Sequence, residues 1–116
     1  MNQNPDNHLR THRKQSGFNQ QEMGAILGCD AGAVSKFEWS HRLPPLQLAL
    51  ALEVVFMVPV SELFSGLSEA VRNPIEKRLS EMEAALGSRS GRGPRAAVTA
   101  KKLEWLMERS RTRTAV

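Results

Sequence analysis

Residues 20–39 read QQEMGAILGCDAGAVSKFEW, and this stretch predicts two short helices joined by a tight turn. Gly24 carries no side chain where the two helices would cross, and Gly28 permits the positive φ that such a turn needs. Val34 supplies an apolar anchor that holds the second helix against the first. The spacing of these three residues is typical of a DNA-binding helix-turn-helix.

The sequence around this stretch predicts more helices and no strand, so we expect an all-α fold. Asn19 and Glu22 have the capping-box spacing, and Asp30 is a suitable N-cap for the second helix of the pair. Pro45 and Pro59 are each suited to the first position of a later helix. The predicted helices of this compact unit cover residues 7–16, 20–27, 31–39, 45–56 and 59–64. Apolar residues occur on nearly every face of the helix predicted over 45–56, so we expect it to be the most buried helix.

The second half of the chain is organised differently. Gly66 is predicted to close the compact unit, and Asn73-Pro74 with Glu76 predicts the start of another helix that ends at Leu86. Residues 87–94 read GSRSGRGP, typical of a flexible basic linker. A last amphipathic helix is expected from Thr99 to Arg109, followed by a disordered tail from 110 to 116. The expected segments are therefore 1–66, 67–86, 87–95 and 96–116.

Length and composition limit the functional classes to which this chain can belong. The chain has 116 residues, 41% hydrophobic and 24% charged, so it can form a small core but is too short for a large multi-domain enzyme. Aromatic residues make up only 5%, which argues against single-strand nucleic-acid binding by base stacking. No motif places a serine, cysteine or histidine in an activated-nucleophile context, so we expect no enzyme.

Cysteine usage and hydropathy favour a cytoplasmic protein. Cys29 is the only cysteine, so no intrachain disulfide can form. Residues 1–6 are polar and do not resemble a signal peptide. The longest apolar stretch, residues 46–60, is interrupted by polar residues and a proline and is too short to span a bilayer. We therefore expect no membrane partner.

Formal charge is +4, but it is unevenly distributed. Residues 1–64 hold five Lys/Arg against six Asp/Glu, whereas residues 65–116 hold eleven against six. Binding of a polyanion by the first half must therefore depend on where its few cations point.

Residues 9–64 resemble the Cro/CI-type (XRE family) helix-turn-helix domain, a five-helix, lambda-repressor-like DNA-binding bundle found in bacterial and phage repressors. The resemblance covers about half of the chain and rests on an ordered set of marks. These are Phe18-Asn19-Gln20, Gly28, the run Val34-Ser35-Lys36-Phe37-Glu38, Pro44, and Ser61-Glu62-Leu63-Phe64.

The resemblance implies that the helix after the turn enters the major groove of double-stranded DNA. Its base-reading positions are Ala31, Gly32, Ser35 and Lys36. Ala31 and Gly32 offer no side-chain hydrogen bond, so much of the sequence preference is expected from Lys36 and from DNA shape. Gln20 matches a phosphate-binding residue, or is simply a helix-start residue.

The remaining charged residues of this half have two expected roles. Arg13 and Glu38 match a family pair that joins two helices, so we assign them to structure. Arg10, Lys14, His41 and Arg42 are candidates for a phosphate-facing rim, and ordinary solvated charges are the alternative.

Three residues depart from the family pattern. Met57 stands where a glycine usually closes a helix, and Glu53 takes a position that is commonly a small alanine. Trp39 replaces a polar residue, and it is expected either in a contact with DNA or a second protomer, or partly buried.

Proteins of this type usually bind paired half-sites as homodimers, so the tail is expected to join two protomers. The seam that Ile75, Leu79, Met82 and Leu86 form is the candidate, although it could instead pack back on the domain. Six arginines add phosphate contacts or serve only as a solubilising tail. They are Arg89, Arg92, Arg95, Arg109, Arg111 and Arg113.

The sequence thus favours a dimeric DNA-binding transcription regulator that represses from a pseudo-palindromic operator. The alternative is an antitoxin-like or anti-activator module that binds a protein partner. A metal site at His8 and His12, with Cys29 and His41 as the remaining ligands, is the remotest reading, and no metal or other cofactor is expected.

Overall fold

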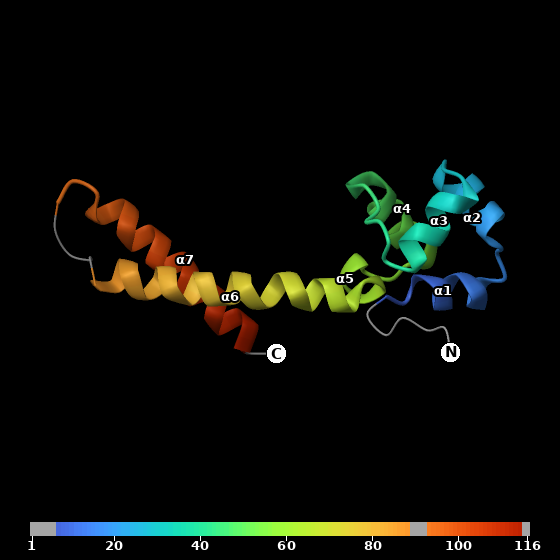
Figure 1. Cartoon of the computed structure of the whole chain (residues 1–116). Coiled ribbons are helices and arrows are strands. Elements are labelled where there is room, and N and C mark those ends of the chain that lie inside the picture. Colours follow the sequence, from blue (N-terminus) through green and yellow to red (C-terminus); the bar gives the residue numbers. More distant parts are fainter. Residues whose placement is uncertain (1–6, 89–92, 115–116) are drawn as a thin grey trace. The chain divides into compact units, whose positions relative to one another are not determined.

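The computed structural model describes residues 7–88 and 93–114, and it is helical with no strand in these ranges (Figure 1). The all-α prediction is confirmed. Its helices are α1 (Leu9–Ser16), α2 (Gln20–Leu27), α3 (Ala31–Glu38), α4 (Leu46–Phe56), α5 (Val60–Leu63), α6 (Ser65–Ser88) and α7 (Ala96–Thr114). The chain forms two compact units, Met1–Val71 and Arg72–Val116, so the division between them falls within α6.

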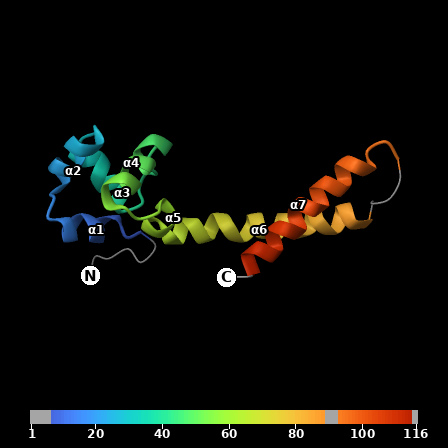
Figure 2. The same ribbon diagram turned by 180° about the vertical axis from the view of Figure 1, so that it is seen from behind.

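The first unit has a single apolar core to which all of its first five helices contribute. In both ribbon views α1 lies along one side of this unit, below α2, α3 and α4 (Figures 1 and 2). Burial of each aliphatic or aromatic side chain contributes about 1.5–3 kcal/mol to folding. The core side chains are Leu9, Met23, Leu27, Val34, Phe37, Leu52, Leu63 and Phe64.

Helix α4 is less buried than its composition predicts. Only Ala49 and Leu52 are buried, whereas Leu46, Leu50 and Val54 are 74%, 51% and 77% exposed. The expectation that this helix would be the most buried is therefore wrong. The reason is that α4 packs one stripe on the core, while the opposite stripe, which is also apolar, is covered by none of the described elements of the first unit.

Helix α6 begins earlier than predicted. The predicted start at Asn73-Pro74 is wrong, because the helix begins at Ser65 and carries Pro74 in its interior. Proline has no N–H for the carbonyl four residues before it, so this position loses one backbone hydrogen bond. Gly66 lies in the first turn of α6 and does not close the unit. Good helix-forming residues precede Asn73, so the chain is already helical when it reaches the proline.

The end of α6 and the whole of α7 are also longer than predicted. Gly87 and Ser88 are helical, and residues 89–92 of the predicted linker lie outside the described residues. Residues 110–114 continue α7, so the prediction of a disordered tail is wrong for them, while 115 and 116 lie outside the described residues. Arg109 and Arg113, one helical turn apart, both reach Glu76 of α6 and hold this end of α7 in place.

Candidate nucleic-acid interface

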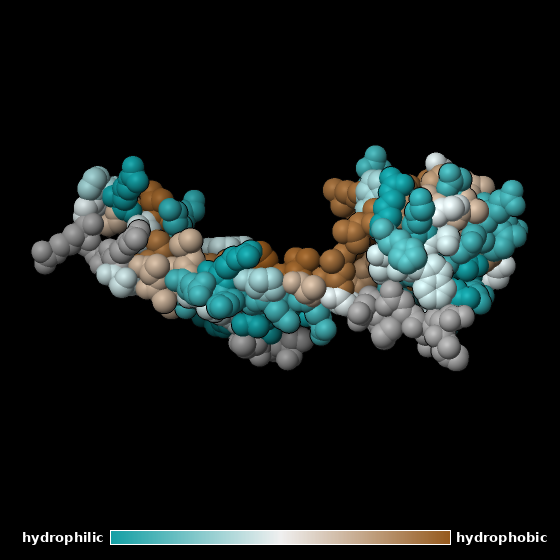
Figure 3. All heavy atoms as spheres, viewed as in Figure 1, coloured by the Kyte–Doolittle hydropathy of each residue, from teal (hydrophilic) through white to brown (hydrophobic). Residues whose placement is uncertain are grey.

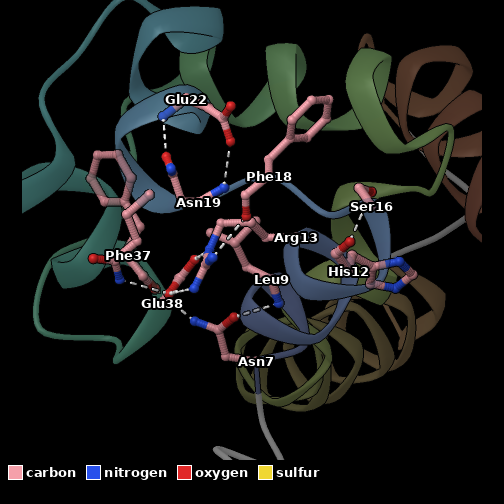
Figure 4. Close-up of polar contacts among 11 residues, drawn as sticks. Asn7, Leu9, His12, Arg13, Ser16, Phe18, Asn19, Glu22, Phe37 and Glu38 are labelled. Carbon is pink, nitrogen blue, oxygen red and sulfur yellow. Dashed lines mark hydrogen bonds and ion pairs between the residues drawn. The ribbon is translucent and has the colours of Figure 1, made fainter.

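Helix α2 starts with a complete capping box (Figure 4). The Asn19 side-chain oxygen accepts a hydrogen bond from the Glu22 amide at 2.7 Å, and the Glu22 carboxylate accepts one from the Asn19 amide at 2.9 Å. Two backbone donors that a helix start leaves unpaired are thus satisfied. The beginning of α2 is fixed by residues that are adjacent in sequence.

The turn between α2 and α3 depends on two glycines. Gly28 has a φ of 83°, in the left-handed region, and its amide donates to the Gly24 carbonyl at 2.7 Å. The Cys29 amide donates to the same carbonyl at 2.8 Å. A Cβ on Gly24 would lie 2.5 Å from the Cys29 carbonyl oxygen, closer than van der Waals contact permits. The absence of a side chain at Gly24 is what allows the turn to lie against α2.

Helix α3 has one face in the core and one in solvent. The Asp30 carboxylate caps it by accepting from the Ala33 amide at 2.7 Å. Val34, Phe37 and Glu38 are buried on its inner face. The predicted base-reading residues lie together on the outer face, where Gly32 and Lys36 are exposed and Ala31 and Ser35 are half-buried.

Arg13 of α1 and Glu38 of α3 form a buried ion pair (Figure 4). One guanidinium nitrogen of Arg13 donates to Glu38 at 3.2 Å, and another donates to the Phe18 carbonyl at 2.9 Å. The Gln20 side-chain amide donates to the same Glu38 carboxylate at 3.1 Å. Gln20, predicted as a phosphate ligand, is therefore oriented by a bond to α3, and its second amide proton and its carbonyl oxygen remain for other contacts.

Asn7, at the start of the first predicted helix, has a structural role that the sequence did not indicate. It is 4% exposed. Its amide nitrogen donates to the Phe37 carbonyl at 2.7 Å and to the Ser40 hydroxyl at 3.2 Å, while its oxygen accepts from the Leu9 amide at 2.9 Å. Asn7 thus ties the start of α1 to the end of α3.

Cationic side chains gather near the C-terminal end of α3. The amides of His41 and Arg42 fold back to the Lys36 carbonyl, at 2.9 and 3.3 Å, which places both residues beside that end. The Arg10 guanidinium lies 5.2 Å from the centre of the Trp39 ring, within the range of a cation–π interaction. Trp39 itself is half-buried.

The other two rim candidates with a described position are Arg42 and Lys14. The Arg42 guanidinium lies 5.9 Å from the Phe37 ring centre. Lys14 is exposed on α1, one turn after Arg10 and on the same helical face. The four rim candidates thus belong to α1 and to the loop after α3.

The acids of the first unit lie mostly at helix starts. Glu22 and Asp30 cap α2 and α3, and the Glu53 carboxylate accepts from the Val60 amide at the start of α5 at 3.0 Å. Glu53, which departs from the family pattern, is exposed and has this capping role. Glu38 is paired with Arg13, so these two charges offset each other. Although the net charge of the first half is close to zero, Lys36, Arg42 and Arg10 lie near the end of α3.

Two of the three histidines contact other side chains, and Cys29 is partly buried. The His8 ring nitrogen lies 3.1 Å from the Ser65 hydroxyl, and the His12 ring lies against Phe56 with 5.8 Å between centroids. Burial, and then the nearby Asp30 carboxylate, raises the pKa of the Cys29 thiol, which disfavours the thiolate that binds metals. No group of three or more metal-ligating side chains occurs among the described residues.

The predicted dimerisation seam lies in the second unit, on α6. Leu79 and Leu86 are half-buried, whereas Ile75 and Met82 are 43% and 53% exposed. Among the six tail arginines, Arg109 and Arg113 bind Glu76, Arg111 binds Glu108, and Arg95 is exposed. Arg89 and Arg92 lie outside the described residues.

Comparisons with protein-family models, with curated proteins and with solved structures found no match to this chain. Within the described ranges, no helix is both long and apolar enough to cross a membrane.

Proposed function

We propose that the first unit is a Cro/CI-type helix-turn-helix domain and that the protein is a dimeric transcription regulator of the XRE family, acting in the cytoplasm. The observation that carries the proposal is the geometry of α2 and α3. A glycine turn, a cap at each helix start and a solvent-facing outer side of α3 together make a helix that can enter a major groove.

The distribution of charge supports the same proposal. Lys36 lies on the outer face of α3, and His41 and Arg42 lie beside the end of that helix. Lys36 would contact base edges, whereas Arg42 would contact phosphates. The small side chains of Ala31 and Gly32 allow the backbone to approach the groove floor closely.

A second candidate function rests on a different observation. The outer stripe of α4 is apolar and exposed, and apolar surface gathers over this helix (Figure 3). Exposed apolar patches of this kind commonly bind protein partners. An antitoxin-like or anti-activator module with weak DNA binding would use such a stripe to hold another protein.

Binding to duplex DNA as a function of salt concentration tests the proposal. Lys36→Ala is expected to weaken binding to the preferred sequence by about 10-fold or more with little effect on non-specific binding. Arg42→Ala should weaken both and reduce the slope of log K against log salt by about 0.9. Lys77→Ala is the matched control, because Lys77 is an exposed lysine of the second unit.

Two results would oppose DNA reading by α3. One is an equal loss of specific and non-specific binding with Lys36→Ala. The other is the absence of any salt-dependent DNA binding by the folded chain, together with a stoichiometric protein partner in the purified material, which would favour the second candidate.

A further inference from the structure

The first unit contains a pocket that the proposed reading of DNA by α3 does not use. Its volume is about 340 Å³, at the lower end of the range for sites that bind small molecules. Residues from the end of α3 and the loop after it line the pocket together with residues from the end of α5 and the start of α6. They include Phe37, Arg42, Leu43, Phe64, Leu67 and Ala70. All of the lining residues precede Arg72, so the pocket belongs wholly to the first unit.

The lining of this pocket is mostly apolar and carries one charge. Phe37 and Phe64 are buried and Leu43 and Leu67 are exposed, so the lining extends from the core to the surface. Arg42 is the only charged residue that lines the pocket. Its guanidinium lies over the Phe37 ring, 5.9 Å from the ring centre, which places the charge against the apolar lining. A ligand that matches this lining has an apolar body and one anionic group.

The loop after α3 holds Arg42 in this position. Ser40 has a φ of 60°, in the left-handed region, so the chain changes direction directly after α3. The Asn7 side chain donates to the Ser40 hydroxyl at 3.2 Å and to the Phe37 carbonyl at 2.7 Å. The Arg42 amide donates to the Lys36 carbonyl at 3.3 Å. The backbone on this side of the pocket is therefore fixed without a ligand, which lowers the entropy lost on binding.

The Arg42 guanidinium forms no ion pair with any acid of the described residues, whose ion pairs involve other arginines. A guanidinium is a planar fork of donors that fits one carboxylate through two parallel hydrogen bonds. A phosphate monoester dianion would bring a second negative charge beside the apolar lining, where it has no partner and is unfavourable. The single cation therefore favours a carboxylate.

We propose that this pocket binds a small organic carboxylate with an apolar body of roughly six to ten carbon atoms, which pairs with Arg42 and so competes with DNA for that residue. The pocket is too small to hold a protein partner, whose interface would bury at least about 1,200 Å² in total. The competition rests on the proposed function, in which Arg42 contacts a phosphate, whereas binding of the carboxylate does not. Because coupling between two ligands is reciprocal, DNA and the carboxylate weaken each other's binding by the same factor.

Titration of the isotope-labelled full chain without DNA, followed by NMR chemical shifts, tests the site itself. The probes are phenylacetate and hexanoate, and the matched controls are their neutral amides, which have the same size and shape. At least one carboxylate is expected to bind with a dissociation constant of about 1 mM or lower, and its amide at least about 10-fold more weakly. The proposal is overturned if neither carboxylate gives a saturable shift up to about 20 mM, or if the amides bind equally well. Inorganic phosphate that binds as tightly as either carboxylate would also overturn it, because the apolar lining would then contribute nothing.

Two substitutions locate the ligand. Arg42→Ala should abolish carboxylate binding, whereas Lys36→Ala, which removes a nearby cation that does not line the pocket, should leave it unchanged. Ala70→Phe places a ring at a lining position and should weaken binding by at least about 10-fold. Ala85→Phe is its control, because Ala85 is also an exposed alanine of α6 but does not line the pocket. Full binding by Arg42→Ala or by Ala70→Phe would put the carboxylate elsewhere and overturn the proposal.

DNA affinity at matched ionic strength tests the competition. Saturating carboxylate is expected to weaken DNA binding by wild type by about 10-fold and to lower the slope of log K against log salt by about 0.9, the change expected for Arg42→Ala. Ala70→Phe retains Arg42, so it should bind DNA as wild type does and respond little to the carboxylate. DNA binding by wild type that saturating carboxylate leaves unchanged would overturn the competition.

These outcomes are separable from failure of the proposed function. A chain that binds the carboxylate through Arg42 but binds no DNA would overturn the regulator proposal and leave the pocket assignment standing. A chain that binds DNA but neither carboxylate would overturn the pocket assignment only.

Discussion

Alanine at Gly24 is the substitution that most sharply tests the geometry of the helix pair. The added Cβ would lie 2.5 Å from the Cys29 carbonyl oxygen and 3.2 Å from the Asp30 carbonyl carbon, both backbone atoms that cannot rotate away. The turn would have to move, which strains the two hydrogen bonds that the Gly24 carbonyl accepts from Gly28 and Cys29.

The expected cost can be worked out from these contacts. Overpacking in a tightly packed place costs about 1–3 kcal/mol, and weakening two hydrogen bonds adds about 1 kcal/mol. Alanine gains about 1 kcal/mol in helix propensity over glycine. We therefore expect Gly24→Ala to lower the free energy of unfolding of the first unit by about 2 kcal/mol, and its Tm by roughly 10 °C.

Gly32→Ala is the matched control on the neighbouring helix. Its Cβ would meet only the Asp30 side chain, at 3.4 Å, an ordinary contact, so the helix-propensity gain should dominate and stabilise by about 0.5–1 kcal/mol. Urea unfolding followed by Trp39 fluorescence, in a Trp105→Phe background, reports on the first unit alone. If Gly24→Ala were neutral or stabilising, the close approach of the turn to α2 would be refuted.

Three further predictions concern contacts elsewhere in the molecule. Arg13→Gln should destabilise the first unit by about 3 kcal/mol in urea unfolding, because it leaves the Glu38 carboxylate buried without its partner. Lys14→Gln, at the neighbouring exposed residue, should change stability by less than about 0.5 kcal/mol. Met57→Gly should raise the free energy of unfolding by up to about 1 kcal/mol, and the Tm with it, because Met57 ends α4 with a φ of 55° and is 88% exposed, so glycine relieves strain and loses little packing. An unchanged or lower Tm would count against a left-handed conformation at this residue. The hydrogen bond from Arg109 holds the pKa of Glu76 below its ordinary value of 4.5, so this contact stabilises the second unit above that pH and is lost as the pH falls below it. Helicity of the second unit should therefore decrease in acid, and Glu76→Gln should remove that part of the pH dependence.

The helix caps and the turn could be predicted because they depend on residues that are close together in the sequence. The caps of α2 and α3 join residues three apart, and the turn between them follows from Gly24 and Gly28, so a short window of sequence is sufficient. The start of α6 shows the limit of the same method. Asn73-Pro74 is a good helix start, but an adequate helix already precedes it, and local preference alone cannot decide between the two arrangements.

Long-range contacts could not be predicted in this way. Asn7 bonds to residues 30 and 33 positions away, and nothing in its neighbourhood distinguishes it from an ordinary helix-start residue. The contact between Arg13 and Glu38 was expected from a family resemblance rather than from spacing, and the bond from Gln20 to Glu38 was not expected at all. The exposed stripe of α4 was missed for a related reason, because hydropathy gives the apolar faces of a helix but not the number of neighbours available to cover them.

Selection from a random duplex library at near-physiological salt, with wild type and Lys36→Ala in parallel, tests the central proposal most directly. Wild type is expected to enrich a motif with two-fold symmetry, and Lys36→Ala is expected to abolish this enrichment while the protein stays folded. A folded wild-type chain that enriches no sequence, or a motif that Lys36→Ala leaves unchanged, would contradict the proposal that α3 reads DNA.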